Sequence, residues 1–227
     1  MKPTGRMVQF NMETGKATGY MALPENPRGG VLVLHAWWGL NDFFKGFCDR
    51  LASHGFLALA PDLYGGPVAK TVSEAKKLMS SFDESSKAPP VVLGAIDYLQ
   101  SQPSQSGRKI GVVGFSMGAA WALWLSTTRP EDVKAVVVFY GTYALDFSNA
   151  KASFLGNFAP EDEWEPTETI RALEQKIRGA GREASFHFYP GTKHWFFEED
   201  RPDAYDREAA GLALNRTLEF LNKKLSS

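Results

Sequence analysis

The feature that most constrains the fold is a regular alternation of short apolar runs with longer segments of helical periodicity. It begins at residue 31, where Val31-Leu32-Val33-Leu34 is continuously apolar, as in a strand buried on both faces. This alternation is typical of an α/β protein with a doubly wound, mostly parallel sheet and helices on both faces. We predict a single domain over residues 1–227, because 227 residues suffice for one sizeable core. The predicted strands cover 31–34, 56–60, 110–113, 133–139, 154–158 and 184–189, and the predicted helices 43–54, 71–82, 89–101, 117–128, 167–179 and 205–225.

Local signals refine the element boundaries. Alternating stretches near 7–11 and 17–23 with Gly15 between them predict a hairpin ahead of the alternation. Asn41-Asp42 is a plausible N-cap for the first helix. Pro89 and Pro90 are expected to open the helix of 89–101, since a first helical turn tolerates proline.

Composition excludes several classes of function. A formal net charge of -1, without a run of basic residues, gives no electrostatic footprint for nucleic acid or an anionic membrane. No segment approaches the roughly 18 to 20 apolar residues of a membrane span. The only cysteine, Cys48, rules out an intramolecular disulfide and argues against a Cys-based zinc site. With no visible signal peptide, we expect a cytoplasmic protein that acts on a small molecule, as a monomer or small homo-oligomer.

A candidate nucleophile lies in Gly-Phe-Ser-Met-Gly at 114–118, directly between a predicted strand and a predicted helix. In Gly-x-Ser-x-Gly, a tight strand-to-helix turn exposes the serine, and the glycines let the neighbouring backbone approach closely. The alternative is a glycine-rich turn whose serine only caps the helix. A serine hydroxyl needs a base and an orienting acid to become nucleophilic, so the rest of the chain decides whether Ser116 is reactive.

The base is expected in the loop after the last strand. His194 lies there, within Tyr-Pro-Gly-Thr-Lys-His-Trp-Phe at 189–196, and follows the chain order nucleophile, acid, histidine. The other histidines, His35, His54 and His187, lie at positions that favour structural roles.

The acid is expected between the serine and the histidine. Three adjacent carboxylates, Glu161, Asp162 and Glu163, follow the strand of 154–158, and periodicity does not choose among them. Backbone N–H groups of Met117 and of Trp37, in the loop after residues 31–34, are the expected oxyanion hole.

The chain resembles the dienelactone hydrolase family of α/β-hydrolases over nearly its whole length. The resemblance is carried by His-Ala-Trp-Trp-Gly-Leu-Asn at 35–41, Ala-Pro-Asp-Leu-Tyr-Gly-Gly at 60–66, the serine motif with its continuation to Ala120, residues 189–196, and Arg-Thr-Leu-Glu-Phe-Leu at 216–221. It implies a hydrolase and selects Asp162 as the acid, four residues before Pro166. A Ser-His-Asp mechanism needs no metal or organic cofactor, and we expect none.

Three departures from the family pattern shape the expected function. The family's usual nucleophile is Cys, where this chain has Ser116, and a Glu that handles the thiol is Ala36 here. The two changes agree with a plain Ser-His-Asp hydrolase. An arginine that holds the carboxylate of dienelactone is replaced by Glu198, which we place at the pocket mouth, where it would repel an anionic substrate.

A neutral ester or lactone is therefore the expected substrate. Aromatic residues on predicted site loops are candidates for an apolar pocket, although about half of them could be packing residues. These candidates are Trp38, Tyr64, Phe115, Trp164 and Phe197, with Trp37 beside them. A thioesterase or acyltransferase with the same triad, and a non-catalytic hydrolase-fold binding protein, remain alternatives.

Overall fold

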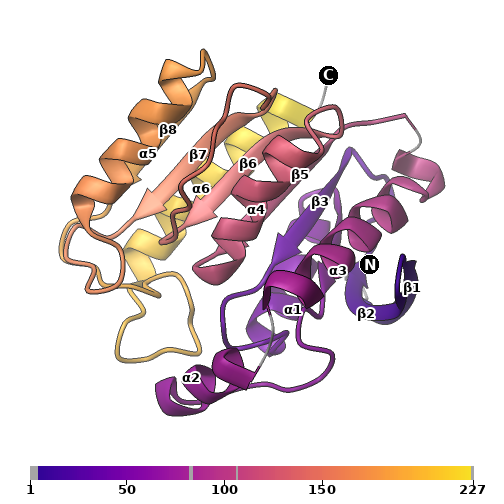
Figure 1. Ribbon diagram of the computed structural model, residues 1–227, viewed down its shortest axis with the longest axis horizontal. Coiled ribbons are helices and arrows are strands. Elements are labelled where there is room, and N and C mark those ends of the chain that lie inside the picture. The colour runs from indigo at the N-terminus through magenta and orange to yellow at the C-terminus, as the bar shows by residue number, and fades with distance from the viewer. Residues whose placement is uncertain (1–4, 82–83, 106, 226–227) are drawn as a thin grey trace. The chain divides into compact units, whose positions relative to one another are not determined.

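The computed structural model describes residues 5–81, 84–105 and 107–225. Its contacts divide the chain into two compact units, Met1–Ile110 and Gly111–Ser227, which are described one at a time. The predicted single domain over 1–227 stays a prediction. Figure 1 gives the element labels used from here on.

The first unit contains a mixed sheet in the order β1-β2-β4-β3. Strands β1 (Arg6–Met12) and β2 (Gly15–Ala22) form the predicted antiparallel hairpin. Its turn lies at residues 13–14, and Gly15, the first residue of β2, has a φ of 134°. Strand β2 also pairs antiparallel with β4 (Phe56–Pro61), and β4 pairs parallel with β3 (Gly29–Leu34). Both β3 and β4 are buried throughout, as their continuous apolar runs predict.

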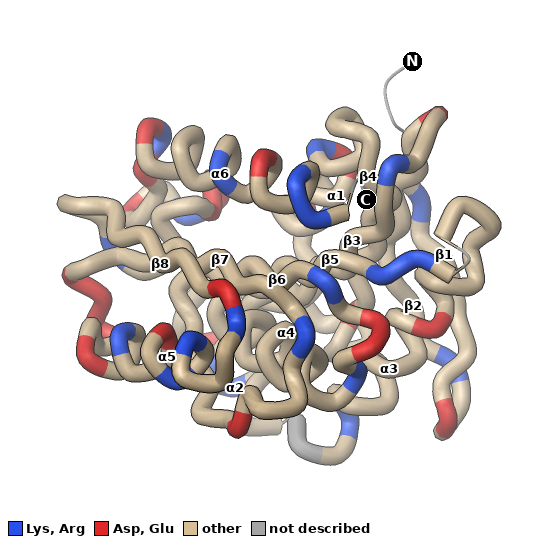
Figure 2. Tube along the Cα trace, turned by 90° about the horizontal axis from the view of Figure 1, so that it is seen from above, with Lys and Arg blue, Asp and Glu red and all other residues tan. Residues whose placement is uncertain are grey.

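Helices cover both faces of this sheet (Figure 2). Helix α1 (Asp42–Ser53) packs on β2 and β4, and Asn41 caps it by accepting the Phe44 N–H at 3.3 Å. On the other face lies α3 (Glu84–Gln100), which contacts all four strands. The short α2 (Val72–Ser81) precedes it, and the 3-10 turn of Pro103–Gln105 follows it. Phe82, the last residue of the helix predicted over 71–82, lies outside the described residues.

The predicted start of α3 was wrong. The helix begins at Glu84, so that Pro89 and Pro90 lie inside it instead of opening it. Each proline removes one backbone hydrogen bond from the helix. The fully buried Ala88 lies directly before the prolines, so the turn ahead of them contributes to the core.

The second unit holds the strands β5 (Ile110–Phe115), β6 (Val133–Phe139), β7 (Ser153–Phe158) and β8 (Ala184–Phe188) in sequential order. The pairs β6–β7 and β7–β8 are parallel, and helix α5 lies in the chain between β7 and β8. This is the mostly parallel arrangement that the alternation predicts.

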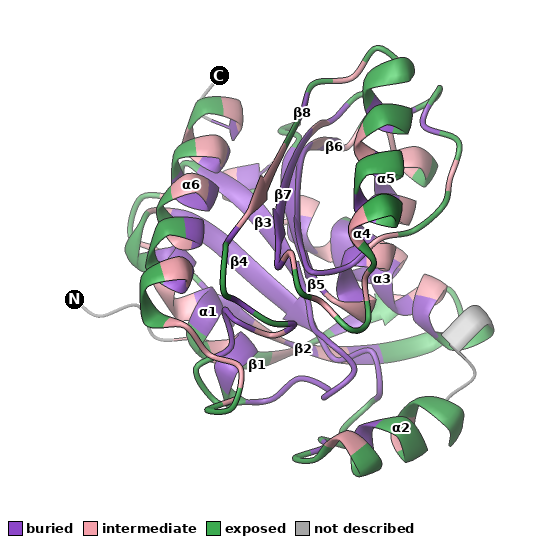
Figure 3. Cartoon of the chain, turned by 90° about the vertical axis from the view of Figure 1, so that its left-hand side faces the viewer, coloured by how far each residue is buried: buried purple, intermediate pink, exposed green. Residues whose placement is uncertain are grey.

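Helices again cover both faces of these strands. Helices α4 (Met117–Thr128) and α5 (Thr167–Gly179) lie on one face, and α6 (Arg207–Leu225) lies on the other (Figure 2). Figure 3 shows buried strands between helices whose outer surfaces are exposed. In α5 the apolar residues predicted to face the core are buried, namely Ile170, Leu173 and Ile177. No helix of the described residues is long and apolar enough to cross a membrane.

Candidate active site

Ser116 lies on a strained turn between β5 and α4. Its backbone has a φ of 50° and a ψ of -114°, a conformation that costs a non-glycine residue on the order of 1–3 kcal/mol. Two hydrogen bonds hold the turn: the Ser116 N–H donates to Phe139 O, and the Ala119 N–H donates to Ser116 O, both at 2.9 Å. The side chain stays partly exposed, so a substrate can reach the hydroxyl.

Two glycines make room for this turn. A Cβ atom on Gly114 would lie 2.2 Å from Gly118 O, and one on Gly141 would lie 2.4 Å from Ser116 O. Neither distance is compatible with a side chain on a fixed backbone. The first glycine of the serine motif is therefore a steric requirement of the turn.

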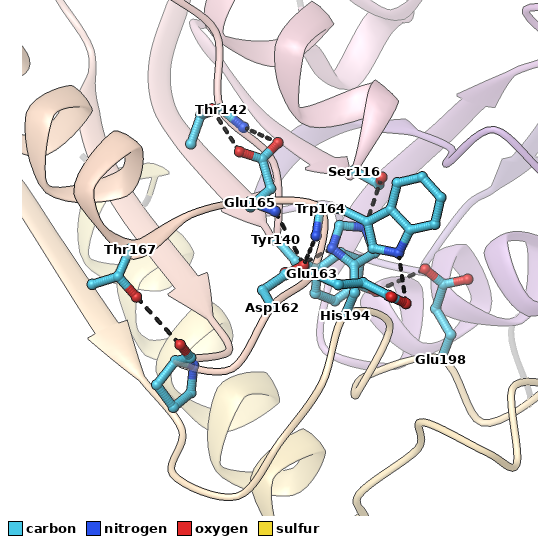
Figure 4. A network of polar contacts seen from close by, with 11 residues as sticks. Ser116, Tyr140, Thr142, Asp162, Glu163, Trp164, Glu165, Thr167, His194 and Glu198 are labelled. Carbon is cyan, nitrogen blue, oxygen red and sulfur yellow. Dashed lines mark hydrogen bonds and ion pairs between the residues drawn. The ribbon is translucent and has the colours of Figure 1, made fainter.

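His194 contacts the serine through one ring nitrogen and Asp162 through the other (Figure 4). Its Nε2 lies 3.0 Å from Ser116 Oγ, and its Nδ1 lies 2.7 Å from Asp162 Oδ2. An ionised carboxylate only accepts hydrogen bonds, so Nδ1 carries the proton and Nε2 is left to accept the hydroxyl proton. This is the tautomer that a general base beside a serine requires.

The structure distinguishes among the three adjacent carboxylates. The Asp162 side chain is fully buried, and its Oδ1 accepts the N–H groups of Trp164 at 2.8 Å and Glu165 at 3.1 Å, which leaves Oδ2 for His194. Glu161 and Glu163 are exposed, and Glu163 accepts a hydrogen bond from the Trp164 indole. Asp162 therefore has the geometry of the orienting acid.

The three-residue segment 140–142, which follows β6, contacts Ser116, His194 and the turn that carries Asp162. No motif in the sequence pointed to this segment. The Tyr140 ring lies 4.9 Å from the His194 ring, between centroids, and Gly141 packs against the Ser116 carbonyl. Thr142 donates to both carboxylate oxygens of Glu165, from its N–H at 3.1 Å and its hydroxyl at 2.7 Å. Glu165 belongs to the turn that Asp162 caps, so this bond ties the acid to the same segment.

Backbone strain is concentrated here. Among the described residues, those other than glycine with a positive φ are Ser116, Tyr140 and Trp195. The first is hydrogen-bonded to His194, and the other two place their rings 4.9 Å from its ring. Such conformations persist where the surrounding structure fixes them, and they are enriched at functional sites.

Glu165 is a partly buried carboxylate on the same loop as Asp162. Burial raises the pKa of Glu165, and the hydrogen bonds from Thr142 and the charge of His194 oppose that rise. Its ionised form is thus maintained by the partners that hold it in place.

The expected position of Glu198 was wrong. Its side chain is not at a pocket mouth but fully buried, and Oε1 accepts the Tyr140 hydroxyl at 2.8 Å. Because Glu198 is buried, this carboxylate presents no charge at the surface.

Two of the predicted pocket residues are core residues. Phe115 is fully buried and Phe197 is 2% exposed, and both rings pack on Phe139, at 4.7 Å and 4.5 Å between centroids. These rings are too enclosed to form the wall of an open pocket, and they pack around Phe139 at the end of β6.

Trp164 behaves differently. It is 39% exposed, and its ring lies 6.4 Å from the His194 ring and 5.9 Å from the Trp195 ring. It is an accessible aromatic surface beside the base, so its predicted role in binding substrate stays a prediction with support.

The remaining predicted residues are distributed over both units. Met117 is the first residue of α4, where backbone N–H groups and the helix dipole favour an anion. Trp37, Trp38 and Tyr64 belong to the first unit, where each is at most 9% exposed. The oxyanion role of Met117 and Trp37, and the pocket role of Trp38 and Tyr64, stay predictions.

His35 is structural, as expected. It is fully buried, its Nδ1 bonds Ala36 O at 2.7 Å, and its Nε2 accepts the Leu63 N–H at 3.1 Å. Burial lowers the pKa of His35, which keeps the ring neutral with both nitrogens occupied.

Comparison with known proteins gives consistent matches along the whole chain. The family model described as the dienelactone hydrolase family matches residues 17–225. A protein named usf from Aquifex pyrophilus is 33% identical, covering 98% of this chain and 100% of the relative.

Solved structures agree with this match. The crystal structure of a dienelactone hydrolase-like promiscuous phosphotriesterase from metagenomic libraries is 25% identical, with a TM-score of 0.87 and 99% coverage of both chains. A dienelactone hydrolase from Anabaena variabilis is 23% identical, with a TM-score of 0.73, 99% coverage of this chain and 100% of that one, and shares the fold.

Proposed function

This chain belongs to the dienelactone hydrolase family, and we propose that it cleaves a neutral carboxylic ester or lactone through an acyl-enzyme formed on Ser116. The observation that carries the proposal is the continuous hydrogen-bonded chain from Ser116 Oγ through His194 to Asp162, at 3.0 Å and 2.7 Å. The strained turn under Ser116 supports it, because a serine that only capped a helix would need no such backbone.

In the proposed reaction His194 Nε2 takes the Ser116 proton as Oγ attacks the substrate carbonyl. Asp162 keeps the imidazole in the required tautomer and stabilises the imidazolium that forms. The negative oxygen of the tetrahedral intermediate is bound by backbone N–H groups, for which Met117 and Trp37 are our candidates. The imidazolium then protonates the leaving oxygen, and the acyl group remains on Oγ.

Water completes the reaction. His194 takes a proton from a water molecule, the resulting hydroxide attacks the acyl carbon, and Ser116 leaves with the proton that His194 returns. The triad supplies nucleophile, base and orienting acid, so the steps require neither a metal ion nor an organic cofactor. We expect the proposed hydrolysis to take place in the cytoplasm.

The preference for a neutral substrate rests on the residues around the site. The loop that carries Asp162 also carries Glu161, Glu163 and Glu165, and it contains no lysine or arginine between Ala159 and Pro166. The exposed ring of Trp164 offers an apolar contact beside the base. An anionic substrate would find no countercharge on this loop, whereas a neutral acyl or aromatic group would find a surface to pack on.

The test is hydrolysis of p-nitrophenyl esters of increasing chain length by the wild type and by Ser116→Ala. Removing a triad nucleophile is expected to lower kcat by on the order of 10⁴-fold or more, with the fold intact. Ser148→Ala, which truncates an exposed serine on the loop after β6, is the matched control and should leave kcat unchanged. Ester hydrolysis that survives Ser116→Ala would refute the assignment.

A substrate panel separates the alternatives. Faster turnover of acyl thioesters than of oxygen esters would identify a thioesterase, and transfer to an added alcohol would identify an acyltransferase. A phosphotriester belongs in the panel because a structural relative is described as a promiscuous phosphotriesterase. A folded wild type inert toward all of these and toward serine-directed phosphonates would indicate a binding protein.

A further inference from the structure

Tyr140 and Glu198 form a buried pair beside His194 that the triad mechanism does not use. Tyr140 is the first residue after β6, and Glu198 follows His194 by four positions. Neither residue is exposed, and the phenol donates to Glu198 Oε1 at 2.8 Å. Figure 4 shows Tyr140, His194 and Glu198 in one group of side chains.

The position of the Tyr140 ring is fixed. Its centroid lies 4.9 Å from that of the His194 ring, with 54° between the planes. The backbone has a φ of 37°, and the Tyr140 N–H donates to Asn157 O at 2.9 Å, beside the last pair of β6 and β7, Phe139 and Asn157. A bulky residue adopts such a backbone only where its surroundings hold it there.

The pair places an aromatic ring and a carboxylate beside the histidine. Burial raises the pKa of Tyr140 well above its ordinary value, and the charge of Glu198 adds to the rise, so the phenol stays protonated and acts as the donor. A donated hydrogen bond favours the ionised form of the accepting carboxylate. An aromatic ring within about 6 Å of a cation attracts it, and a phenol bonded to an anion carries additional electron density.

We propose that Tyr140 and Glu198 are positioning residues for His194, which restrain the imidazole and stabilise the imidazolium that forms when Ser116 loses its proton. The ring provides the restraint, and the negative charge of Glu198 acts across it. This inference rests on the proposed function for its catalytic consequence, but not for its effect on the proton affinity of His194.

Other charged groups also face this part of the site. Asp162 bonds His194 directly, and Glu165 interacts with it electrostatically. The charge of Asp200 contributes to the raised pKa of Tyr140, and Arg201 forms an ion pair with Asp200 at 3.3 Å. A substitution of Glu198 leaves all four of these groups in place, so the change in His194 reports the contribution of Glu198.

The decisive experiment is an NMR titration of the four histidine imidazoles in the wild type, Glu198→Gln and Glu198→Asp. Glu198→Gln keeps an acceptor for the phenol but removes the charge, so the pKa of His194 should fall by about one pH unit. Glu198→Asp keeps the charge and should retain most of the wild-type value, even if shortening the side chain destabilises the fold.

Activity gives the second readout. Because the neutral histidine is the active base, the acid limb of kcat/KM should move to lower pH in Glu198→Gln, by the same amount as the NMR pKa. At the pH plateau kcat should fall about threefold, since a weaker base is a poorer catalyst. Glu199→Gln removes the neighbouring exposed carboxylate and should leave both readouts unchanged.

A His194 pKa that is the same in the wild type and Glu198→Gln would overturn the inference, as would an equal shift in Glu199→Gln. If Glu198→Gln does not fold, Glu198→Asp is compared with Glu199→Gln. A His194 pKa that is a full unit lower in Glu198→Asp would then contradict the inference, because aspartate keeps the charge. The titration needs no substrate, so it remains decisive even if the proposed hydrolysis is absent.

Discussion

At the scale of single residues, the site depends on close backbone packing that only glycine permits. Gly114 and Gly141 have no Cβ, and backbone atoms of the Ser116 turn and the start of α4 fill the space that a Cβ would need. Ser116 is held in a conformation that costs free energy, and the packing around these two glycines keeps that conformation in place.

Gly114→Ala should therefore destabilise the protein and abolish activity together. The added methyl would lie 2.2 Å from Gly118 O, and relieving that overlap is expected to lower the free energy of unfolding by about 1–3 kcal/mol. Chemical denaturation measures the loss.

Gly211→Ala is the control for that substitution. Gly211 lies inside α6, and a Cβ added there would meet no heavy atom within 4 Å beyond its own helix backbone and chain neighbours. Helix propensity predicts a gain of about 0.5–1 kcal/mol in the free energy of unfolding. Equal stability of the two variants would show that the Ser116 turn does not need the close approach at Gly114.

At the scale of elements, the segments that follow β5, β6, β7 and β8 bring Ser116, Asp162 and His194 together with the residues that support them. Two carboxylates hold the loop of residues 159–166, called the acid loop because it carries Asp162. Asp162 accepts backbone N–H groups of its own turn, and Glu165 accepts hydrogen bonds from Thr142 on the loop after β6. The position of Asp162 relative to His194 is thus set partly by a residue that is not on its own loop.

Thr142→Val tests this link. The substitution keeps the shape of the side chain but removes the hydroxyl that donates to Glu165 at 2.7 Å. We expect the free energy of unfolding to fall by about 1–2 kcal/mol, since a hydrogen bond to a charged group is lost, and kcat to fall about tenfold as the acid loop loosens.

Thr217→Val provides the comparison. Thr217 is buried on α6, and its hydroxyl makes no hydrogen bond to any described residue, so valine should be neutral or stabilising and leave kcat unchanged. The link between the loops would be refuted if Thr142→Val altered kcat no more than Thr217→Val does.

The elements were predictable because each has a local cause. The buried run of β3, the cap at Asn41 and the apolar stripe of α5 are readable within a few residues. The start of α3 was missed because two prolines locally favour a first helical turn. The turn before them carries the fully buried Ala88, and burial of that kind is not visible in the local sequence.

The triad geometry was partly predictable for a different reason. Ser116 has a local motif, and His194 follows from chain order, but periodicity did not choose among three adjacent carboxylates. The family resemblance selected Asp162, and its hydrogen bonds support that choice. Tyr140 and Glu198 lie 58 residues apart, and no periodicity connects them. The same limit explains Phe115 and Phe197, which pack against Phe139 from distant parts of the sequence.

At the scale of the whole molecule, the fold and the chemistry are separable. The match to the family extends over residues 17–225, whereas the proposed chemistry depends on a few side chains at the ends of strands. Because hydrolase folds of this kind support many reactions, the function is inferred from the site and not from the fold.

Stability of the whole molecule should depend on pH through His35. Burial keeps its folded-state pKa below the ordinary value near 6.5. Above that pH both states are neutral; as the pH falls below it, the unfolded chain binds a proton that the folded chain excludes. The free energy of unfolding should then decrease by up to about 1.4 kcal/mol per pH unit.

His35→Gln should flatten this dependence, as measured by denaturation between pH 8 and pH 5. The slope should not vanish, because burial also lowers the pKa of His187. His54→Gln, at the exposed end of α1, serves as the control and should keep the wild-type slope. An unchanged slope in His35→Gln would mean that another group controls the loss of stability in acid.

The most direct test of the central claim is covalent labelling with a serine-directed phosphonate, followed by intact-mass and peptide analysis. An activated Ser116 predicts one adduct per chain, located on the peptide that contains residues 114–118, and no adduct in Ser116→Ala. Labelling should also be strongly slowed in Asp162→Asn, where the histidine loses its orienting carboxylate. No adduct on the wild type, or equal labelling of Ser116→Ala, would contradict the claim that Ser116 is the nucleophile.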